Sequence, residues 1–120
     1  MQIKIKCRGD CLIVRLNGEL DMASVQIFKD KVIPALDKNN LNYLLLNLKN
    51  VSFIDSTGLG AILGRYRILS RKGGGILLVG LKPQVKRIFL FFVMLKIMNV
   101  YDSEENALMS LNDEEEYNLA

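Results

Sequence analysis

Apolar and polar side chains alternate at the start of the chain, and this pattern predicts a β-hairpin. In residues 2–8 every second side chain is apolar and the positions between are polar, as in a strand with one solvated face. A second apolar run over residues 11–16 follows a Gly-Asp turn, and we expect the Asn-Gly pair after it to end the strand. Cys7 and Cys11, which we take as reduced thiols, either face each other across the turn or are two small buried hydrophobes.

Four later segments place apolar residues at helical spacing. The first follows Asp21, whose carboxylate can accept a bond from a free helix N–H, and contains Pro34, where we expect a kink or an early end. The third opens with Pro83 in its first turn, and the fourth begins near Asp102 with acids at the positive helix end. The apolar helical positions are Val25, Phe28, Val32 and Leu36; Leu59, Ile62, Leu63, Tyr66 and Leu69; Val85, Ile88, Phe89 and Phe92; and Ala107, Leu108 and Leu111.

Between these helices lie short apolar runs that are typical of strands covered on both faces. They span residues 43–48, 76–80 and 96–100. The resulting order, two strands and then three further strands that alternate with helices, predicts one α/β domain with a mixed sheet of about five strands and about four helices. We place the domain at residues 1–111 and an acidic C-terminal tail at residues 112–120.

Charge is unevenly distributed along the chain, which has a net charge of +3. All 16 Lys and Arg and six of the acids lie within residues 1–100, a balance of +10, whereas the last twenty residues hold seven acids and no base. The basic side chains are scattered and few aromatics lie among them, so we expect an acidic protein partner and no direct contact with nucleic acid.

Several function classes are excluded by what the composition lacks. The chain has no histidine, which removes Ser-His-Asp and Cys-His catalysis and His-ligated metals. It has no apolar run long enough to span a membrane, and its charged, alternating start is unlike a signal peptide, so we expect a cytoplasmic protein. We expect no metal site and no cofactor.

The most unusual segment is residues 55–64, a hydroxylated loop followed by a helix with three glycines in its first two turns. It matches neither the phosphate-binding P-loop nor the dinucleotide loop, although free N–H groups at a helix start attract anions. Either Ser56 or Thr57 is only the cap of this helix, or the helix start binds a phosphoryl group, which is attached to Ser56 or carried by a ligand. Gly60 and Gly64 share one helix face, so either the domain's own sheet or a partner protein should come close to it.

Ser56 lacks the surroundings of a catalytic nucleophile. No Gly-x-Ser-x-Gly elbow is present, no histidine can take its proton, and no Ser-x-x-Lys pair begins at Ser56. We therefore do not expect Ser56 to be the nucleophile of a hydrolase.

Four motifs resemble the STAS domains of bacterial anti-sigma factor antagonists. They are Gly-Glu-Leu-Asp at residues 18–21, Leu-Asn-Leu at 46–48, Phe-Ile-Asp-Ser-Thr-Gly-Leu-Gly at 53–60 and Ile-Leu-Gly-Arg-Tyr at 62–66. The resemblance covers nearly all of residues 2–111 and implies a single STAS domain. It also implies partner switching: the unphosphorylated protein binds an anti-sigma factor that is a serine kinase and frees the sigma factor, with sporulation as the pathway it favours.

The same resemblance implies which residues carry the switch. The kinase uses ATP to phosphorylate Ser56, which releases the complex, and a PP2C-type phosphatase restores the hydroxyl. The resemblance thus implies that the protein itself has no catalytic role and is not an enzyme. The alternative is a STAS scaffold or sensor module that binds a nucleotide or another small anion at the same helix start. The expected partner-binding residues are Glu19, Asp21, Asp55, Ser56, Thr57, Gly58 and Gly60, and Arg65 and Arg67 are further candidates for contact with acidic groups of the kinase.

One segment departs from the family pattern. Relatives often have a polar, Gly-containing turn before the strand at residues 96–100, whereas this chain has eight apolar residues at 88–95. We expect Phe89 and Phe92 to pack inward and to leave Leu90, Phe91 and Met94 partly exposed. Such a patch suggests a homodimer contact, a partner site or an aggregation hazard.

Overall fold

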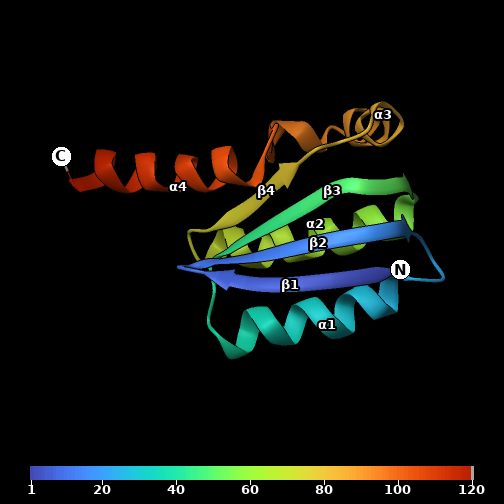
Figure 1. The fold of residues 1–120 in the computed structure, drawn as a ribbon, viewed down its shortest axis with the longest axis horizontal. Helices are drawn as coiled ribbons and strands as arrows, with labels where there is room; N and C mark the ends of the chain where they lie inside the picture. The colour runs from blue at the N-terminus through green and yellow to red at the C-terminus, as the bar shows by residue number, and fades with distance from the viewer. Residues whose placement is uncertain (120) are drawn as a thin grey trace.

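Five strands form one mixed sheet in which neighbours along the chain are also neighbours in space (Figure 1). The structure, a computed structural model, describes the backbone of residues 1–119 and the side chains of residues 1–112. The strands are β1 (Gln2–Arg8), β2 (Cys11–Leu20), β3 (Tyr43–Ile54), β4 (Gly75–Val79) and β5 (Asn99–Tyr101). The helices are α1 (Val25–Lys38), α2 (Ser56–Arg71), α3 (Pro83–Phe91) and α4 (Glu104–Leu119), with a short 3₁₀ helix η1 (Met94–Lys96) before β5.

Strand directions explain how the helices divide between the two faces of the sheet. β1 and β2 are antiparallel, and the next three pairs are parallel. Each parallel step moves the same way across the sheet, so right-handed crossovers place their helices on one face. Side chains of α1, α2 and α3 accordingly share one core with the sheet, whereas α4 covers a smaller core on the other face. The α/β class and the mixed sheet predicted from the sequence are confirmed.

Three strand predictions need correction. β3 does not end at residue 48 but runs from Tyr43 to Ile54, because its pairing with β2 continues to Leu20. β2 does not end at Asn17 and Gly18 but continues to Leu20. Shifts in its register with β3 on both sides of this pair accommodate the Gly18 φ of 126°, so the pairing of the two strands continues. The last strand begins only at Asn99, because η1 occupies the start of the expected run.

The two cysteines neither face each other nor share a buried environment. Arg8 pairs with Cys11 and Cys7 with Leu12, so adjacent register positions send the thiols to opposite faces. Cys11 is buried, and burial raises its pKa to about 12, whereas Cys7 is exposed. The prediction of a buried residue was therefore right for Cys11 and wrong for Cys7.

The helix ends also differ from those expected. α1 runs past the exposed Pro34 to Lys38, because buried Val32 and Leu36 hold its last turns on the sheet. α4 continues to Leu119. The boundary between a domain at residues 1–111 and a tail at residues 112–120 stays a prediction, because side chains from residue 113 onward lie outside the described residues.

Burial along the apolar run at residues 88–95 differs from what a helical spacing predicts. Phe89 is buried as expected, but Phe92 is exposed and Met94 is buried. The reason is Val93, whose φ of 60° is left-handed and breaks the helical phase between α3 and η1. None of the described helices is long and apolar enough to cross a membrane.

Candidate functional site

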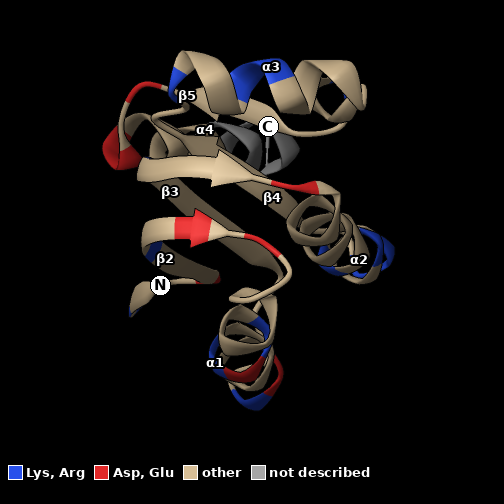
Figure 2. Ribbon diagram, turned by 90° about the vertical axis from the view of Figure 1, so that its right-hand side faces the viewer, with Lys and Arg blue, Asp and Glu red and all other residues tan. Residues whose placement is uncertain are grey.

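The candidate site lies at the carboxyl ends of β2 and β3, where the loop before α1 meets the start of α2. Figure 2 looks onto this end and shows acidic residues at the tip of β2, in the following loop and in the link into α2. Leu20 pairs with Ile54 in the parallel register, and the Asp55 N–H donates to the Leu20 carbonyl over 3.2 Å. The two loops therefore meet at this edge of the sheet.

Asp55 fixes the geometry at the start of α2. It holds the N-cap position in extended conformation, and its Oδ1 accepts a 2.9 Å bond from the Gly58 N–H. Its Oδ2 accepts a 3.0 Å bond from the Met22 N–H in the loop before α1. One carboxylate thus stabilises the first turn of α2 and ties that turn to the neighbouring loop.

Ser56 is left free by this arrangement. It is the first residue of α2 and is exposed, and within the side chains described its hydroxyl makes no hydrogen bond. The interpretation of Ser56 or Thr57 as the helix cap is therefore wrong, because Asp55 already caps the helix. Thr57 follows half-buried in the same turn. The hydroxyl of Ser56 is thus available at the positive end of the α2 dipole.

The loop before α1 is built from short polar side chains. The Asp21 Oδ1 accepts bonds from the Ala23 and Ser24 N–H groups over 3.0 and 3.1 Å. The Ser24 hydroxyl donates to the Glu19 carbonyl over 2.6 Å and accepts a bond from the Asp21 N–H. Asp21 therefore closes the turn that precedes α1 rather than capping the helix, since α1 begins at Val25 with Ser24 at its N-cap position.

Glu19 differs from the other two acids at this edge. It is exposed, and within the described part of the chain its carboxylate has no hydrogen-bond or ion-pair partner. The carboxylate of Glu19 is therefore available to a partner, whereas those of Asp21 and Asp55 already hold backbone N–H groups.

The three glycines of α2 fall into two groups. A Cβ on Gly58 would lie 2.4 Å from the Leu20 carbonyl oxygen, so only glycine lets α2 approach β2 this closely. A Cβ on Gly60 or Gly64 would meet no atom within 4 Å. The domain's own sheet therefore explains Gly58 but not the Gly60 and Gly64 face, which is open.

Sequence reasoning missed two apolar members of this surface. Met22 is exposed beside Asp55, to which its N–H donates, and the exposed Phe53 pairs with Glu19 in the parallel register. Nothing in the sequence marks them, because Met and Phe most often belong to a core. They give the acidic edge the mixed apolar and polar character of a docking surface.

The two arginines proposed as kinase contacts have different surroundings. Arg65 lies 3.9 Å from the Asp37 carboxylate of α1 and is mostly covered, whereas Arg67 is exposed. Arg67 is therefore the more accessible of the two.

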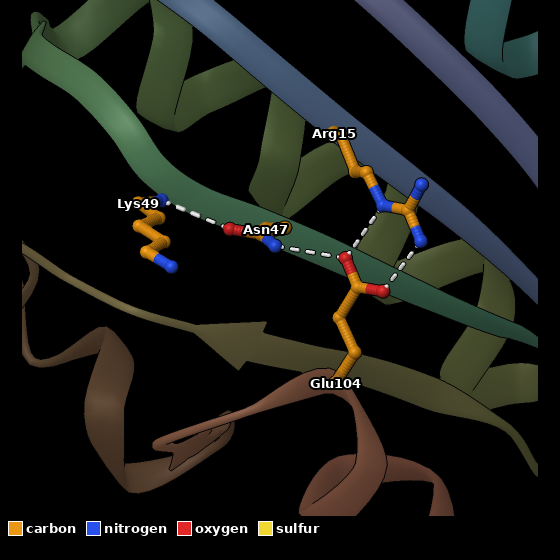
Figure 3. A network of polar contacts seen from close by, with 4 residues as sticks. All are labelled: Arg15, Asn47, Lys49 and Glu104. Atoms are coloured by element: carbon orange, nitrogen blue, oxygen red, sulfur yellow. Dashed lines mark hydrogen bonds and ion pairs between the residues drawn. The ribbon is translucent and has the colours of Figure 1, made fainter.

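A second polar cluster lies on the α4 side of the sheet, away from this edge (Figure 3). Glu104, in the first turn of α4, accepts two 2.8 Å bonds from the Arg15 guanidinium and one of 2.8 Å from the Asn47 amide. The Asn47 Oδ1 in turn accepts the Lys49 N–H over 3.1 Å. The hydrogen bonds from Arg15, opposed by partial burial and aided by Asn47, lower the pKa of Glu104 to about 2.

Comparisons with known proteins agree with this geometry. The family described as STAS domain matches residues 2–107. The chain is 39% identical to an anti-sigma F factor antagonist of Paenibacillus polymyxa, over 92% of this chain and 95% of that relative.

Two solved structures are also similar. One is the anti-sigma factor antagonist SpoIIAA in its unphosphorylated form, with a TM-score of 0.82 and 27% identity over 93% of this chain and 97% of that one. The other is the Bacillus cell fate determinant SpoIIAA in the phosphorylated form, with a TM-score of 0.73 and 27% identity over 92% of this chain and 99% of that one.

Proposed function

The chain belongs to the STAS domain family, and we propose that it acts as an anti-sigma factor antagonist, which binds an anti-sigma factor and thereby frees a sigma factor. The observation that carries the proposal is the exposed, unbonded hydroxyl of Ser56 at the start of α2, directly after the capping Asp55. We place the protein in the cytoplasm and in a sporulation pathway, as a regulator rather than an enzyme.

The switch is a phosphoryl transfer catalysed by the partner. The anti-sigma factor acts as a serine kinase: the Ser56 Oγ attacks the γ-phosphorus of ATP, the bond to the bridging oxygen breaks, ADP leaves and the hydroxyl proton is released. A PP2C-type phosphatase later hydrolyses the ester with water, which yields inorganic phosphate and the free hydroxyl. The antagonist supplies the acceptor and the docking surface.

The local electrostatics suit such a switch. A phosphoryl group adds about −1.5 to −2 charges, which the helix dipole tolerates at the start of α2, so the fold should persist. The docked complex should not persist, because the added charge must be desolvated beside the Asp55 carboxylate. Within the described side chains, Asp55 has no Lys or Arg partner that would offset the new charge.

The docking surface comprises the loop before α1 and the exposed part of α2. Glu19 and the Oδ2 atom of Asp21, which unlike Oδ1 accepts no bond from the described residues, supply polar contacts on one side of Ser56, and Thr57 and Gly60 extend the surface along α2. Gly58 contributes from inside, by allowing α2 to lie against the end of β2. The alternative, a small-anion site at the same helix start, gains no support from the structure because the Asp55 carboxylate already occupies the Gly58 N–H.

Phosphorylation by candidate anti-sigma kinases tests the proposal. Wild type, Ser56→Ala and Thr57→Ala are incubated with each kinase and ATP, and intact mass and phosphopeptide mapping locate any product. We expect one phosphoryl group on wild type and Thr57→Ala, mapped to Ser56, and none on Ser56→Ala. Phosphate that remains on Ser56→Ala, or none on wild type from kinases active on their own substrates, would contradict the proposal.

A further inference from the structure

Several apolar side chains are exposed at the end of α3 and in the turns that follow it, and this group is here termed the α3 tip. Phe91 is 79% exposed, and the ring of Phe92 packs against it edge to face with centroids 5.1 Å apart. Leu90, Val93 and Ile97 are each exposed to 44% or more. Soluble monomers seldom expose contiguous apolar patches without a binding role.

The backbone holds these side chains outward. Buried Phe89 and Met94 anchor the segment on both sides of the turn. Between them Val93 adopts a φ of 60°, a conformation that is rare for a β-branched residue, while its N–H donates to the Leu90 carbonyl over 3.0 Å. The exposure of the α3 tip is therefore set by a defined turn between two buried anchors.

Cations accompany the α3 tip on the same helix face. Lys86 and Arg87 are exposed and lie one turn before Leu90 and Phe91, which places each pair on one side of α3. Figure 2 shows that Lys and Arg positions recur along α3. The stretch of residues 56–101 contains eight Lys and Arg and no Asp or Glu. The neighbourhood along the chain is thus purely cationic.

The exposed apolar side chains and the adjacent Lys and Arg together distinguish between two candidate partners of the α3 tip. A second copy docked through the same patch would bring two sets of cations together, which is unfavourable at a shared interface. An anionic lipid surface accepts apolar side chains and attracts Lys and Arg at once. The rise of about 1.5 Å per residue puts Lys86 about 7.5 Å behind Phe91 along the axis of α3, so an end-on contact can insert the apolar tip while the cations stay at the phosphates.

We propose that the α3 tip binds the surface of an anionic lipid bilayer, with Phe91 and its apolar neighbours inserted and Lys86 and Arg87 on the headgroups. This contact is independent of Ser56 and of the proposed antagonist function. It would hold the regulator at a membrane while the acidic edge near α2 remains a separate surface.

A fluorescent reporter tests the contact directly, because the chain contains no tryptophan. Phe91→Trp places a single indole at the α3 tip, and Ile27→Trp places one on α1, which lies far from α3 in Figures 1 and 2, at a side chain 50% exposed. With vesicles of phosphatidylglycerol and phosphatidylcholine we expect a blue shift of the emission of Phe91→Trp and quenching by brominated lipid. We expect neither change for Ile27→Trp.

Vesicle sedimentation with matched variants separates the apolar and the charged contributions. Phe91→Ser should lower the partition coefficient about tenfold, and Lys86→Gln about fivefold, whereas Ile27→Ser should leave it unchanged. Binding should also weaken as salt rises, because the attraction of the headgroups for Lys and Arg is screened.

Three results would overturn the proposal. One is the absence of a blue shift for Phe91→Trp with anionic vesicles. Another is equal binding to vesicles of phosphatidylcholine alone, which would remove the role of the cations. The third is concentration-dependent self-association, measured by light scattering, that Phe91→Ser abolishes while vesicle binding is absent, which would assign the α3 tip to a homodimer.

Discussion

Two carboxylates stand at the starts of two helices on opposite faces of the sheet, and their surroundings differ. Asp55 at the start of α2 accepts bonds from two backbone N–H groups and, within the described side chains, has no cationic partner. Glu104 at the start of α4 is held by the Arg15 guanidinium and the Asn47 amide. Both positions suit an acid next to the helix dipole, but only Glu104 has its charge offset by another side chain.

The difference indicates which end can respond to added charge. Around Glu104 the charge is already balanced, and the arrangement serves to fasten α4 to β2 and β3. The Asp55 carboxylate is paired only with backbone N–H groups among the described residues. A phosphoryl group on Ser56 would therefore have no Lys or Arg beside Asp55 to offset its charge. A charge added at Ser56 should therefore change the affinity of a protein that docks on that edge.

The largest effect should come from placing a charge at Ser56. We expect Ser56→Asp to weaken binding of the anti-sigma factor about 100-fold, or about 3 kcal/mol, because a carboxylate must then be desolvated beside Asp55. Ser56→Ala should bind as wild type does, and titration calorimetry measures all three proteins. Equal affinity of wild type and Ser56→Asp for the anti-sigma factor would contradict the proposed difference between the starts of α2 and α4.

Gly58→Ala should have the next largest effect, on folding. Its Cβ would lie 2.4 Å from the Leu20 carbonyl oxygen, so α2 or β2 must shift. We expect a loss of about 2 kcal/mol in the free energy of unfolding, measured by urea denaturation. A stability equal to that of wild type would show that the close approach of α2 to β2 is not required.

Removal of the charge at the other end should matter less. Glu104→Gln loses the ion pair with Arg15, and we expect a cost of about 1 kcal/mol at neutral pH, because half-exposed Arg15 is screened by solvent. The pKa of Glu104 is lowered from its ordinary value of 4.5 to about 2 in the folded state. Its stabilisation is therefore present above about pH 4.5 and is lost as the pH falls toward 2.

Urea denaturation of wild type and Glu104→Gln at several pH values checks this pH dependence. The difference between their free energies of unfolding should shrink on acidification. Asp55→Ala is the matched variant at α2, with an expected cost of about 1 kcal/mol from the lost cap. High salt should reduce the effect of Glu104→Gln but not that of Asp55→Ala, since the partners of Asp55 are backbone N–H groups. If the free energies of unfolding of wild type and Glu104→Gln differed more at low pH than at neutral pH, the stabilising role of Glu104 would be contradicted.

Gly60→Ala should have the smallest effect, and one of opposite sign. Because nothing lies within 4 Å of the added Cβ, the substitution should stabilise the fold by about 0.5–1 kcal/mol through helix propensity. Binding of the anti-sigma factor should nevertheless weaken if a partner approaches this face. A stabilised variant with unchanged affinity would place Gly60 outside the docking surface.

The sequence predicted most of the scaffold and the position at which α2 starts, because both depend on local patterns. The alternation of apolar runs and helical stripes gave the strand and helix order, and the unusual loop at residues 55–64 marked the start of α2. The errors arose where tertiary contacts decide. The register with β3 carries β2 past Gly18, and the left-handed turn at Val93 exchanges the environments of Phe92 and Met94.

The details of the site were harder to predict for the same reason. The capping role of Asp55 and its bond to Met22 depend on two loops that are 33 residues apart in the chain. The exposure of Met22 and Phe53 follows from how the sheet ends, which no spacing in the sequence encodes.

The order of the strands across the sheet, which is also their order along the chain, has a consequence for synthesis. As the polypeptide leaves the ribosome, the β1–β2 hairpin forms first and each later strand is added at a free edge, without insertion between strands already paired. The second face is covered only after the whole sheet has been synthesised, because α4 follows β5 along the chain. Until that helix has left the ribosome, the apolar side chains of Ile13, Leu45 and Leu77 stay open to water, so a chain whose sheet has formed without α4 exposes an apolar face that chaperones can bind.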